Sequence, residues 1–281
     1  MQVVVPVKSF NNAKKRLATV LTAQQRCGLM KHMLDDVLSA IVATREVEGI
    51  TVVTSDAEVA QWVAKFAQGI KTPLRTFDPG SHQVGSNHAG CNKTNRKINR
   101  KTGAKPSLSS GNQLAEAGLC HAYSAVAADL LTRGASTMLL LPADIPLVTK
   151  SDIQALLAEH TCPGVSLAAA GSDGGTNALL VSPPNIIAPA FGDNSCQRHS
   201  AHAREQGLEP VVLNTAGLNL DIDTLEDIYA LLATDRECAT LRYLFDSGIA
   251  TELEKSAEDG HLQGTTFRQS DPQNQTNRQV G

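Results

Sequence analysis

The sequence has few of the features that characterise proteins acting on nucleic acids or membranes. Aromatic residues make up only 4% of the chain, which disfavours stacking platforms for single-stranded nucleic acid. The formal net charge is −3, so no general attraction to nucleic acid or to an anionic membrane surface is expected. No apolar stretch approaches the length of a membrane-spanning helix. We therefore expect neither nucleic acid nor membrane as a partner.

The cysteines lack the spacing of a metal site or a redox pair. The chain has no C-x-x-C pair, and its six cysteines are scattered: Cys27, Cys91, Cys120, Cys162, Cys196 and Cys238. The chain opens directly on an apolar segment, without a signal-peptide pattern before it. Free thiols in a reducing cytosol are the simplest interpretation, so a cytoplasmic location is expected.

Two common phosphate-binding patterns are also missing. The chain contains neither a G-x-x-x-x-G-K-[ST] loop nor a G-x-G-x-x-G fingerprint, which disfavours a P-loop ATPase and a dinucleotide-binding Rossmann enzyme. No Ser/His/Asp or Cys/His arrangement is identifiable, so covalent catalysis has no specific support. A bound phosphate would have to be held by cationic side chains and by loop N–H groups.

What the chain does contain is an alternation of strand-like and helix-like segments. Its first part predicts strands at 2–7 and 50–54 and helices at 22–43 and 57–67. This order is typical of a parallel α/β sheet. Further strands are expected at 137–141, 165–170, 177–182 and 211–213, and further helices at 114–131, 149–160, 195–206 and 224–232.

The alternation is interrupted at residues 80–113, which carry six Lys or Arg residues and no Asp or Glu. A solvated, disordered insert is the favoured interpretation, and a phosphate-binding lid is the alternative. The end of the chain is polar and Gln/Asn-rich, as is typical of a disordered tail. We expect one domain over 1–254, with the insert at about 80–113 and the tail over 255–281.

Three cationic residues follow the first predicted strand: Lys8, Lys14 and Arg16. Ligands of open α/β sheets bind beyond the carboxyl ends of the strands. The three side chains are therefore expected at the mouth of a site, facing an anion. Phosphate is the natural candidate, because Arg offers a fork of donors and Lys a mobile point charge. The neighbouring Lys15 is interpreted as an exposed surface charge.

Carboxylates follow other predicted strands. Asp144 comes after the most apolar one and suits a divalent metal such as Mg²⁺, although a turn Asp bonding its own backbone is an equal alternative. Asp221 and Asp223 lie on the same side of an extended segment, where both could face one ligand. The alternative is that they stabilise the N-terminal dipole of the following helix. Asp144 paired with this second cluster offers the two carboxylates that a metal–triphosphate complex would need.

A third group of candidates lies around two turn-rich segments. Ser195, near Gly192, presents N–H and hydroxyl donors to a second anion, or is a plain N-cap. His199 follows one helical turn later on the same face. A partly buried structural histidine is the alternative for His199.

These segments together resemble the 2-phospho-L-lactate guanylyltransferases, which make a precursor of the deazaflavin coenzyme F-420. The resemblance runs in order from residue 2 to about 233 through Pro6-Val7-Lys8, Ala13-Lys14-Lys15-Arg16-Leu17-Ala18, Val52-Val53-Thr54-Ser55-Asp56, Leu141-Pro142-Ala143-Asp144-Ile145-Pro146, Gly175-Thr176-Asn177, Phe191-Gly192-x-x-Ser195-x-x-x-His199 and Asp221-Ile222-Asp223-Thr224. It implies a GT-A-like nucleotidyltransferase fold of the α/β class, with a single mixed, mostly parallel sheet flanked by helices.

The resemblance also implies an activity: transfer of GMP from GTP to 2-phospho-L-lactate, phosphoenolpyruvate or 3-phospho-D-glycerate, with release of pyrophosphate. By position, Asp144 and Asp223 would bind Mg²⁺. Lys8, Lys14 and Arg16 would bind the phosphates of GTP. The expected catalytic residues are these three cations and Asp144. Thr176, Gly192 and Ser195 would hold the acceptor's carboxylate or phosphate, with His199 assigned to the same site. Related proteins are often dimeric, so a homodimer is expected.

Two alternatives stay open, because a fold does not settle an activity. The chain is also compatible with another nucleotidyltransferase of this fold, acting with CTP or on a sugar phosphate. It is compatible as well with a non-catalytic GTP-binding protein.

Overall fold

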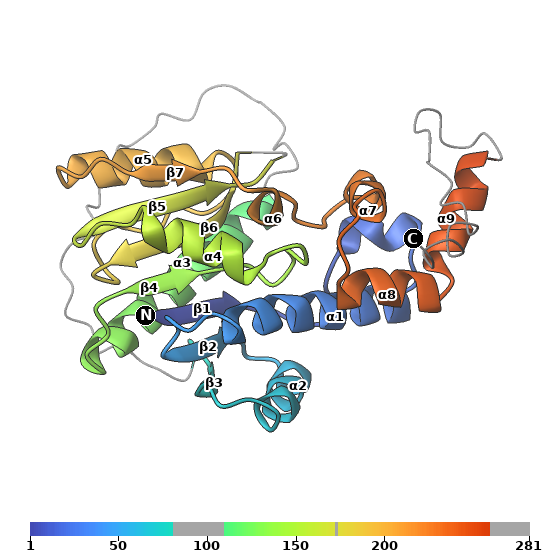
Figure 1. The fold of residues 1–281 in the computed structure, drawn as a ribbon, viewed down its shortest axis with the longest axis horizontal. Coiled ribbons are helices and arrows are strands. Elements are labelled where there is room, and N and C mark those ends of the chain that lie inside the picture. The colour runs from blue at the N-terminus through green and yellow to red at the C-terminus, as the bar shows by residue number, and fades with distance from the viewer. Residues whose placement is uncertain (81–109, 172–173, 259–281) are drawn as a thin grey trace, which may run out of the picture.

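The computed structural model describes residues 1–80, 110–171 and 174–258, and these form a layered α/β structure (Figure 1). The strands are β1 (Gln2–Pro6), β2 (Gly49–Val53), β3 (Leu74–Phe77), β4 (Met138–Leu140), β5 (Gly164–Ala169), β6 (Thr176–Ser182) and β7 (Val211–Leu213). The helices are the 3₁₀ turn η1 (Lys15–Thr19) and α1 (Ala23–Val42), α2 (Ala57–Ala67), α3 (Ser110–Thr132), α4 (Lys150–Ala158), α5 (Ser195–Glu205), α6 (Ala216–Asn219), α7 (Leu225–Leu232), α8 (Ala239–Asp246) and α9 (Ile249–Glu258).

The described strands make one sheet in the order β3-β2-β1-β4-β6-β5-β7. β1 to β4 are mutually parallel and β5 is parallel to β7, whereas β6 pairs antiparallel with both of its neighbours. Because β6 runs in the opposite direction, its first residues lie at the sheet edge where β1 and β4 end. Thr176 and Asn177 are thereby brought to the edge that carries ligands in open α/β sheets. The predicted fold class is confirmed.

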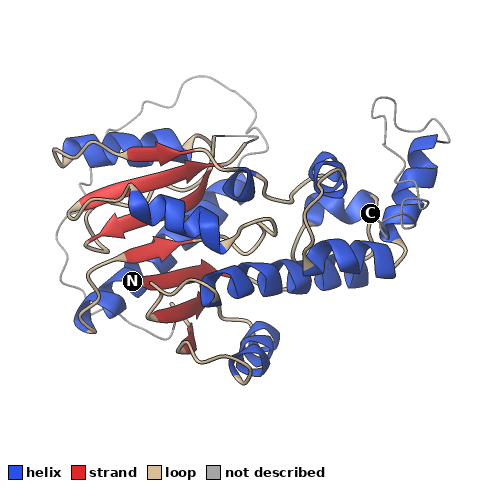
Figure 2. Ribbon diagram, in the orientation of Figure 1, coloured by secondary structure: helices blue, strands red, loops and turns tan. Residues whose placement is uncertain are grey.

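The sheet is buried on both faces, as its continuous apolar runs predict. Successive side chains of a strand point to opposite faces: Val3 and Val5 pack in the core on the α1 side, and Val4 packs in the core that includes α3 and α5. Helix α1 extends past the sheet and meets α8, while α7 and α9 lie at the same end of the molecule (Figure 2). No helix in the described part of the chain is long and apolar enough to cross a membrane.

Local signals in the sequence locate most of these elements to within a few residues. Capping boxes open two of the predicted helices, at Thr149 and Thr224, with Asp152 and Asp227 completing them. The patterns miss β3, α6, α8 and α9, which are short or follow polar segments. β3, for example, is a four-residue strand at the edge of the sheet.

Helical structure extends into both segments that were expected to be disordered. α3 begins at Ser110, inside the expected insert, and α9 continues to Glu258, beyond the expected boundary at 254. The rest of both predictions, for 81–109 and 259–281, lies outside the described residues. The five cysteines within the described ranges are free thiols.

The contact between α1 and α8 depends on a glycine. A Cβ at Gly28 would overlap the phenol ring of Tyr243. That ring is fixed, because its hydroxyl donates to the Gln25 carbonyl oxygen at 3.0 Å and it stacks on His32 with ring centroids 4.5 Å apart. Such overpacking forces a backbone shift, which typically costs 1–3 kcal/mol.

We therefore expect Gly28→Ala to lower the free energy of unfolding by about 2 kcal/mol, measured by urea titration. The matched control is Gly118→Ala in α3, where a Cβ would have no atom within 4 Å. Helix propensity predicts that this control is neutral or stabilised by up to about 1 kcal/mol. Equal stability of the two variants would contradict the packing argument.

Candidate functional site

A buried lysine lies between two carboxylates at the ligand-binding edge of the sheet. Lys14 Nζ donates to Asp144 Oδ2 at 2.6 Å and to Asp223 Oδ1 at 2.7 Å. The Lys14 side chain is only 6% exposed. The structure thus brings together three residues separated by up to 209 positions in the sequence.

Each member of this cluster is held by its own local structure. Asp144 follows β4, and its carbonyl oxygen accepts a hydrogen bond from the Ile222 N–H at 3.0 Å. This bond holds the segment carrying Asp223 beside Asp144. Lys14 is the N-cap of η1, with φ 51° and ψ 46°. A left-handed conformation costs a non-glycine residue about 1–2 kcal/mol, so the ion pairs form against local backbone strain.

The charges of the cluster shift one another's protonation. Burial alone would lower the pKa of Lys14, but Asp144 and Asp223 outweigh it, and the pKa is raised above its usual range. Burial would raise the pKa of Asp223, but Lys14 and then Arg16 lower it. Lys14 therefore stays an ammonium and Asp223 a carboxylate at neutral pH.

A third carboxylate lies beside the pair. Burial, and then the like charge of Asp144, raises the pKa of Asp221 to about 6. Its Oδ1 accepts a hydrogen bond from Asn177 Nδ2 at 3.3 Å. Asn177 was not among the predicted site residues, because its contact depends on the reversed direction of β6. Its position next to Thr176 in the sequence was the one available signal.

The remaining predicted cations lie nearer the solvent. Arg16 Nη1 is 3.6 Å from Asp223 Oδ2, and its side chain is 66% exposed. Lys8 follows β1 and is exposed. Lys15 is exposed as well, in agreement with its interpretation as a surface charge. The site therefore combines one buried ammonium with two exposed cations on the same loop.

The carboxylates fit a small hard cation. One oxygen of Asp144 and one of Asp223 contact the Lys14 ammonium, and each carboxylate has a second oxygen besides. Among the described residues there is no group of three or more His, Cys, Asp or Glu side chains that could hold a metal. Mg²⁺ is commonly bound through one or two carboxylates together with substrate phosphates and waters. The donor set therefore suits Mg²⁺ arriving with a phosphate ligand better than a metal held by protein alone.

A second cluster adjoins the first through Thr176 and Asn177. Thr176 Oγ1 is 2.8 Å from Ser195 Oγ and 3.0 Å from His199 Nδ1. Ser195 is buried and His199 is fully buried. Gly192 lies in the same loop, with φ 103°, and its carbonyl oxygen accepts from the Ser195 N–H at 3.0 Å.

The N-cap interpretation of Ser195 is wrong. Asn194 is the N-cap of α5, in a left-handed conformation, and Ser195 is the first helical residue. The Ser195 hydroxyl contacts Thr176 instead of capping the helix. The hydroxyl of Ser195 therefore belongs to the second cluster.

Burial of His199 has a consequence for stability. Burial, assisted by the charges of His202 and Arg198, lowers the pKa of His199 to about 4 from 6.5. Between these values the unfolded chain binds a proton that the folded chain does not, so stability decreases as pH falls. Between pH 7 and pH 5 the free energy of unfolding of the parent should fall by about 2 kcal/mol more than that of His199→Asn, as measured by urea unfolding. Parallel losses in the two proteins would contradict this assignment.

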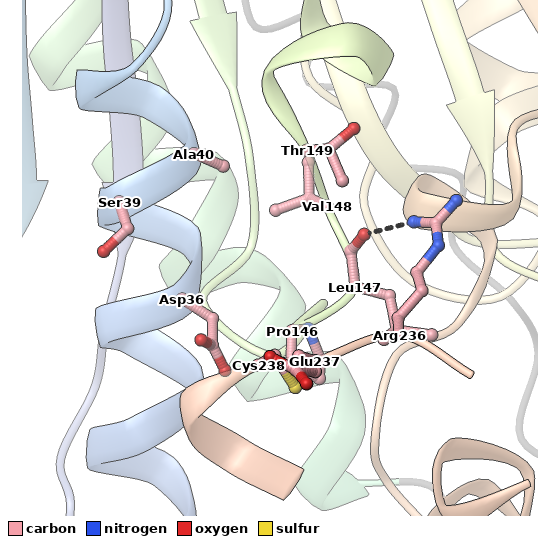
Figure 3. Close-up of a pocket in the computed structure, with 10 residues that line it drawn as sticks. All are labelled: Asp36, Ser39, Ala40, Pro146, Leu147, Val148, Thr149, Arg236, Glu237 and Cys238. Carbon is pink, nitrogen blue, oxygen red and sulfur yellow. Dashed lines mark hydrogen bonds between the residues drawn. The ribbon is translucent and has the colours of Figure 1, made fainter. Parts of the chain in front are cut away.

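The described structure also has a cavity of about 210 Å³ between α1, the loop before α4 and the segment before α8 (Figure 3). None of the predicted site residues lines it. Two of its charged side chains are engaged in the fold: Arg236 donates to the Leu147 carbonyl oxygen at 2.7 Å, and Asp36 accepts from the Ala239 and Thr240 N–H groups. This cavity is part of the packing between α1 and α8.

A mostly parallel sheet with cations, carboxylates and hydroxyl groups at the end where its parallel strands finish suits a nucleotidyl-transferring enzyme. The structure superposes on a putative nucleotide-diphospho-sugar transferase from Desulfovibrio desulfuricans with a TM-score of 0.62 and 16% identity, covering 90% of this chain and 96% of the other. At that identity the match shows the fold alone.

The sequence specifies the family. A family model described as "Guanylyl transferase CofC like" matches residues 1–74 and 117–263. The chain is 34% identical over 228 residues to the phosphoenolpyruvate guanylyltransferase of Sphaerobacter thermophilus, covering 81% of this chain and 90% of the relative. It is 28% identical over 225 residues to the 2-phospho-L-lactate guanylyltransferase of Methanothermobacter thermautotrophicus, covering 80% and 81%. The chain belongs to this guanylyltransferase family, and the predicted resemblance is confirmed.

Proposed function

We propose that this protein transfers GMP from GTP to a phosphorylated three-carbon carboxylic acid, releasing pyrophosphate, as a step in the biosynthesis of coenzyme F-420. The acceptor is 2-phospho-L-lactate, phosphoenolpyruvate or 3-phospho-D-glycerate. The observation that carries the proposal is the adjacency of the two clusters: Asn177 contacts Asp221 in the first, and its neighbour Thr176 belongs to the second. Family membership supports guanine as the base.

The first cluster would receive the triphosphate. Lys14 contributes a buried positive charge, and the more exposed Lys8 and Arg16 contribute charges that a mobile ligand can reach. These cations offset the charge that develops on the departing pyrophosphate. A fixed ammonium in a buried site does this with little reorganisation, which is how preorganised charges accelerate a reaction.

Two carboxylates contact this single buried lysine and Asp221 lies near both of them, so the cluster retains negative charge that would repel a triphosphate. Asp144 and Asp223 would hold Mg²⁺, with Asp221 beside them. When bound there, Mg²⁺ supplies charge neutralisation and a template that orients the reacting phosphates. The two carboxylates would supply its protein oxygens, and Lys14, which contacts both, keeps them close together.

The second cluster would hold the acceptor. Thr176 contacts Ser195 and His199, and Gly192 lies in the loop before Ser195. Thr176, Gly192 and Ser195 would hold an anionic group of the acceptor across from the triphosphate. An oxygen of the acceptor phosphate then attacks the α-phosphorus of GTP, and the bond to the pyrophosphate breaks. A phosphate monoester is already largely ionised near neutral pH, so no general base is required. Positioning and electrostatics carry the catalysis.

A panel of nucleotides and acceptors tests this proposal. The purified protein is incubated with Mg²⁺, with GTP or CTP, and with each of the three acids or a sugar phosphate, and pyrophosphate release is followed. The expected result is release with GTP and at least one of the three acids. Release only with CTP or a sugar phosphate would assign the enzyme to another nucleotidyltransferase class. Binding of GTP with no release in any combination would favour a non-catalytic GTP-binding protein.

A further inference from the structure

The contacts of His199 fix which of its ring nitrogens carries the proton. Nε2 accepts a hydrogen bond from the Ala190 N–H at 2.9 Å. A backbone N–H can only donate, so Nε2 is the unprotonated nitrogen of a neutral ring. The proton is therefore on Nδ1, which donates to Thr176 Oγ1 at 3.0 Å. The low pKa of the ring, about 4, keeps this neutral form across the neutral range.

This tautomer decides how the two neighbouring hydroxyl protons are used. Thr176 and Ser195 have one hydroxyl proton each, and their mutual hydrogen bond at 2.8 Å takes one of them, whichever residue donates. Because His199 donates to Thr176, neither hydroxyl proton is directed at the ring. One hydroxyl proton is thus left for a ligand.

The opposite tautomer would change that result. Thr176 would then donate to Nδ1 of His199, and Ser195 would donate to Thr176. Both hydroxyl protons would be used within the cluster, and the pair would have only lone pairs to offer. Two hydroxyls that present only lone pairs would repel an anion. The Ala190 contact therefore determines whether Thr176 and Ser195 can bind an anionic ligand.

We propose that His199 is a positioning residue that makes the Thr176–Ser195 pair a hydrogen-bond donor to an anionic oxygen of the acceptor. The inference rests on the proposed function and deepens it, because it assigns His199 a role behind the binding hydroxyls rather than in direct contact with the acceptor. Full burial of His199 agrees with that placement. Ser195 begins the eleven-residue helix α5, whose N-terminal dipole favours negative charge at the same place.

The tautomer is measured first, on the parent protein without substrates. Nitrogen-15 NMR of the histidine rings distinguishes a protonated Nδ1 from a protonated Nε2, and the spectrum of His199→Asn identifies the His199 signals. We expect protonation at Nδ1. Protonation at Nε2 would overturn the inference, whether or not the protein transfers GMP.

Two substitutions then separate the two contacts of the ring. His199→Asn retains a donor near the position of Nδ1 and loses the acceptor for Ala190, whereas His199→Gln retains an acceptor near the position of Nε2 and loses the donor to Thr176. We expect His199→Gln to raise the acceptor KM about tenfold, as for one lost hydrogen bond, with the GTP KM unchanged. His199→Asn should stay within about threefold of the parent.

His202→Gln is the matched control, on the same helix at a more exposed position, and it should leave both KM values unchanged. Thr176→Val removes the hydroxyl itself, so it should raise the acceptor KM at least as much as His199→Gln does. If His199→Gln does not fold, the tautomer measured by NMR decides the inference. Equal increases in both KM values, or a His199→Asn defect as large as that of His199→Gln, would overturn the inference. Absence of transfer by the parent would instead reject the proposed function, and the NMR result would still decide the tautomer.

Discussion

Replacing Asp144 with asparagine should reduce kcat/KM for GMP transfer by about 10³-fold, or about 4 kcal/mol in barrier. The carboxylate of Asp144 is one of the two that converge on a single cation at the ligand-binding edge. Asparagine has nearly the same shape but no charge, so the change removes the electrostatic contribution of the side chain with little change in packing. Pyrophosphate release at saturating Mg²⁺ measures the effect.

The control for this prediction is Asp246→Asn, which neutralises an exposed carboxylate at the end of α8. It should keep the parental rate, and both variants should show the parental circular-dichroism spectrum. A folded Asp144→Asn protein with a rate within about tenfold of the parent, roughly 1.4 kcal/mol, would show that this carboxylate does not bind an essential metal.

Replacing Lys14 with methionine should both slow the reaction and destabilise the fold. Loss of the buried ammonium removes positive charge from the triphosphate site, and we expect a decrease in kcat/KM for GTP of at least about 100-fold. It also leaves Asp144 and Asp223 without their shared partner, with the Asp221 carboxylate beside them. Breaking a buried ion pair costs 3–5 kcal/mol. Because Asp144 and Asp223 are 26% and 41% exposed, solvent screening reduces the expected loss to about 2 kcal/mol at pH 7.

The pH dependence of that loss has a definite sign. In the parent, Lys14 lowers the pKa of Asp223, so the ionised carboxylate stabilises the fold above its unfolded pKa, and this contribution disappears as pH falls through the folded value. In the variant the ionised carboxylates repel one another, and protonation relieves the repulsion. The stability difference should therefore be largest at pH 7 and should shrink below about pH 6, where Asp221 takes up a proton.

Urea unfolding at pH 7 and pH 5 in metal-free buffer measures this difference. The matched control is Lys15→Met, because Lys15 is the exposed neighbour of Lys14 in the same loop, and its replacement should change stability by less than about 0.5 kcal/mol. If Lys14→Met is as stable as this control at pH 7, the ion-pair account is wrong.

The order of elements could be predicted from the sequence because its signals are local. Strands that are buried on both faces appear as continuous apolar runs, and the capping boxes at Thr149 and Thr224 mark helix starts within four residues. β3 could not be predicted in this way, because a short strand at the edge of the sheet has half-exposed residues and no continuous apolar run. Helix α8 packs against α1 and α9 packs against α8, and no local pattern reports these contacts.

Three of the predicted site residues lie in one cluster, but the geometry of that cluster could not be predicted. Spacing and resemblance indicated Lys14, Asp144 and Asp223, yet nothing in the sequence shows that the lysine lies between the two carboxylates. The contact of Asn177 with Asp221 follows from the reversed direction of β6, which is a property of strand pairing. The Ala190 contact that fixes the ring of His199 depends on the course of the loop between β6 and α5, which no local pattern reports.

The most direct test of the account follows the α-phosphorus of GTP. The protein is incubated with Mg²⁺, phosphoenolpyruvate, 2-phospho-L-lactate or 3-phospho-D-glycerate, and GTP labelled at the α-phosphate, and the products are separated and identified by mass spectrometry. The account predicts that the label appears in a compound in which GMP is joined to the acid through a diphosphate, together with unlabelled pyrophosphate. Label that stays in GTP with every acid, or appears in GDP beside free phosphate, would contradict it.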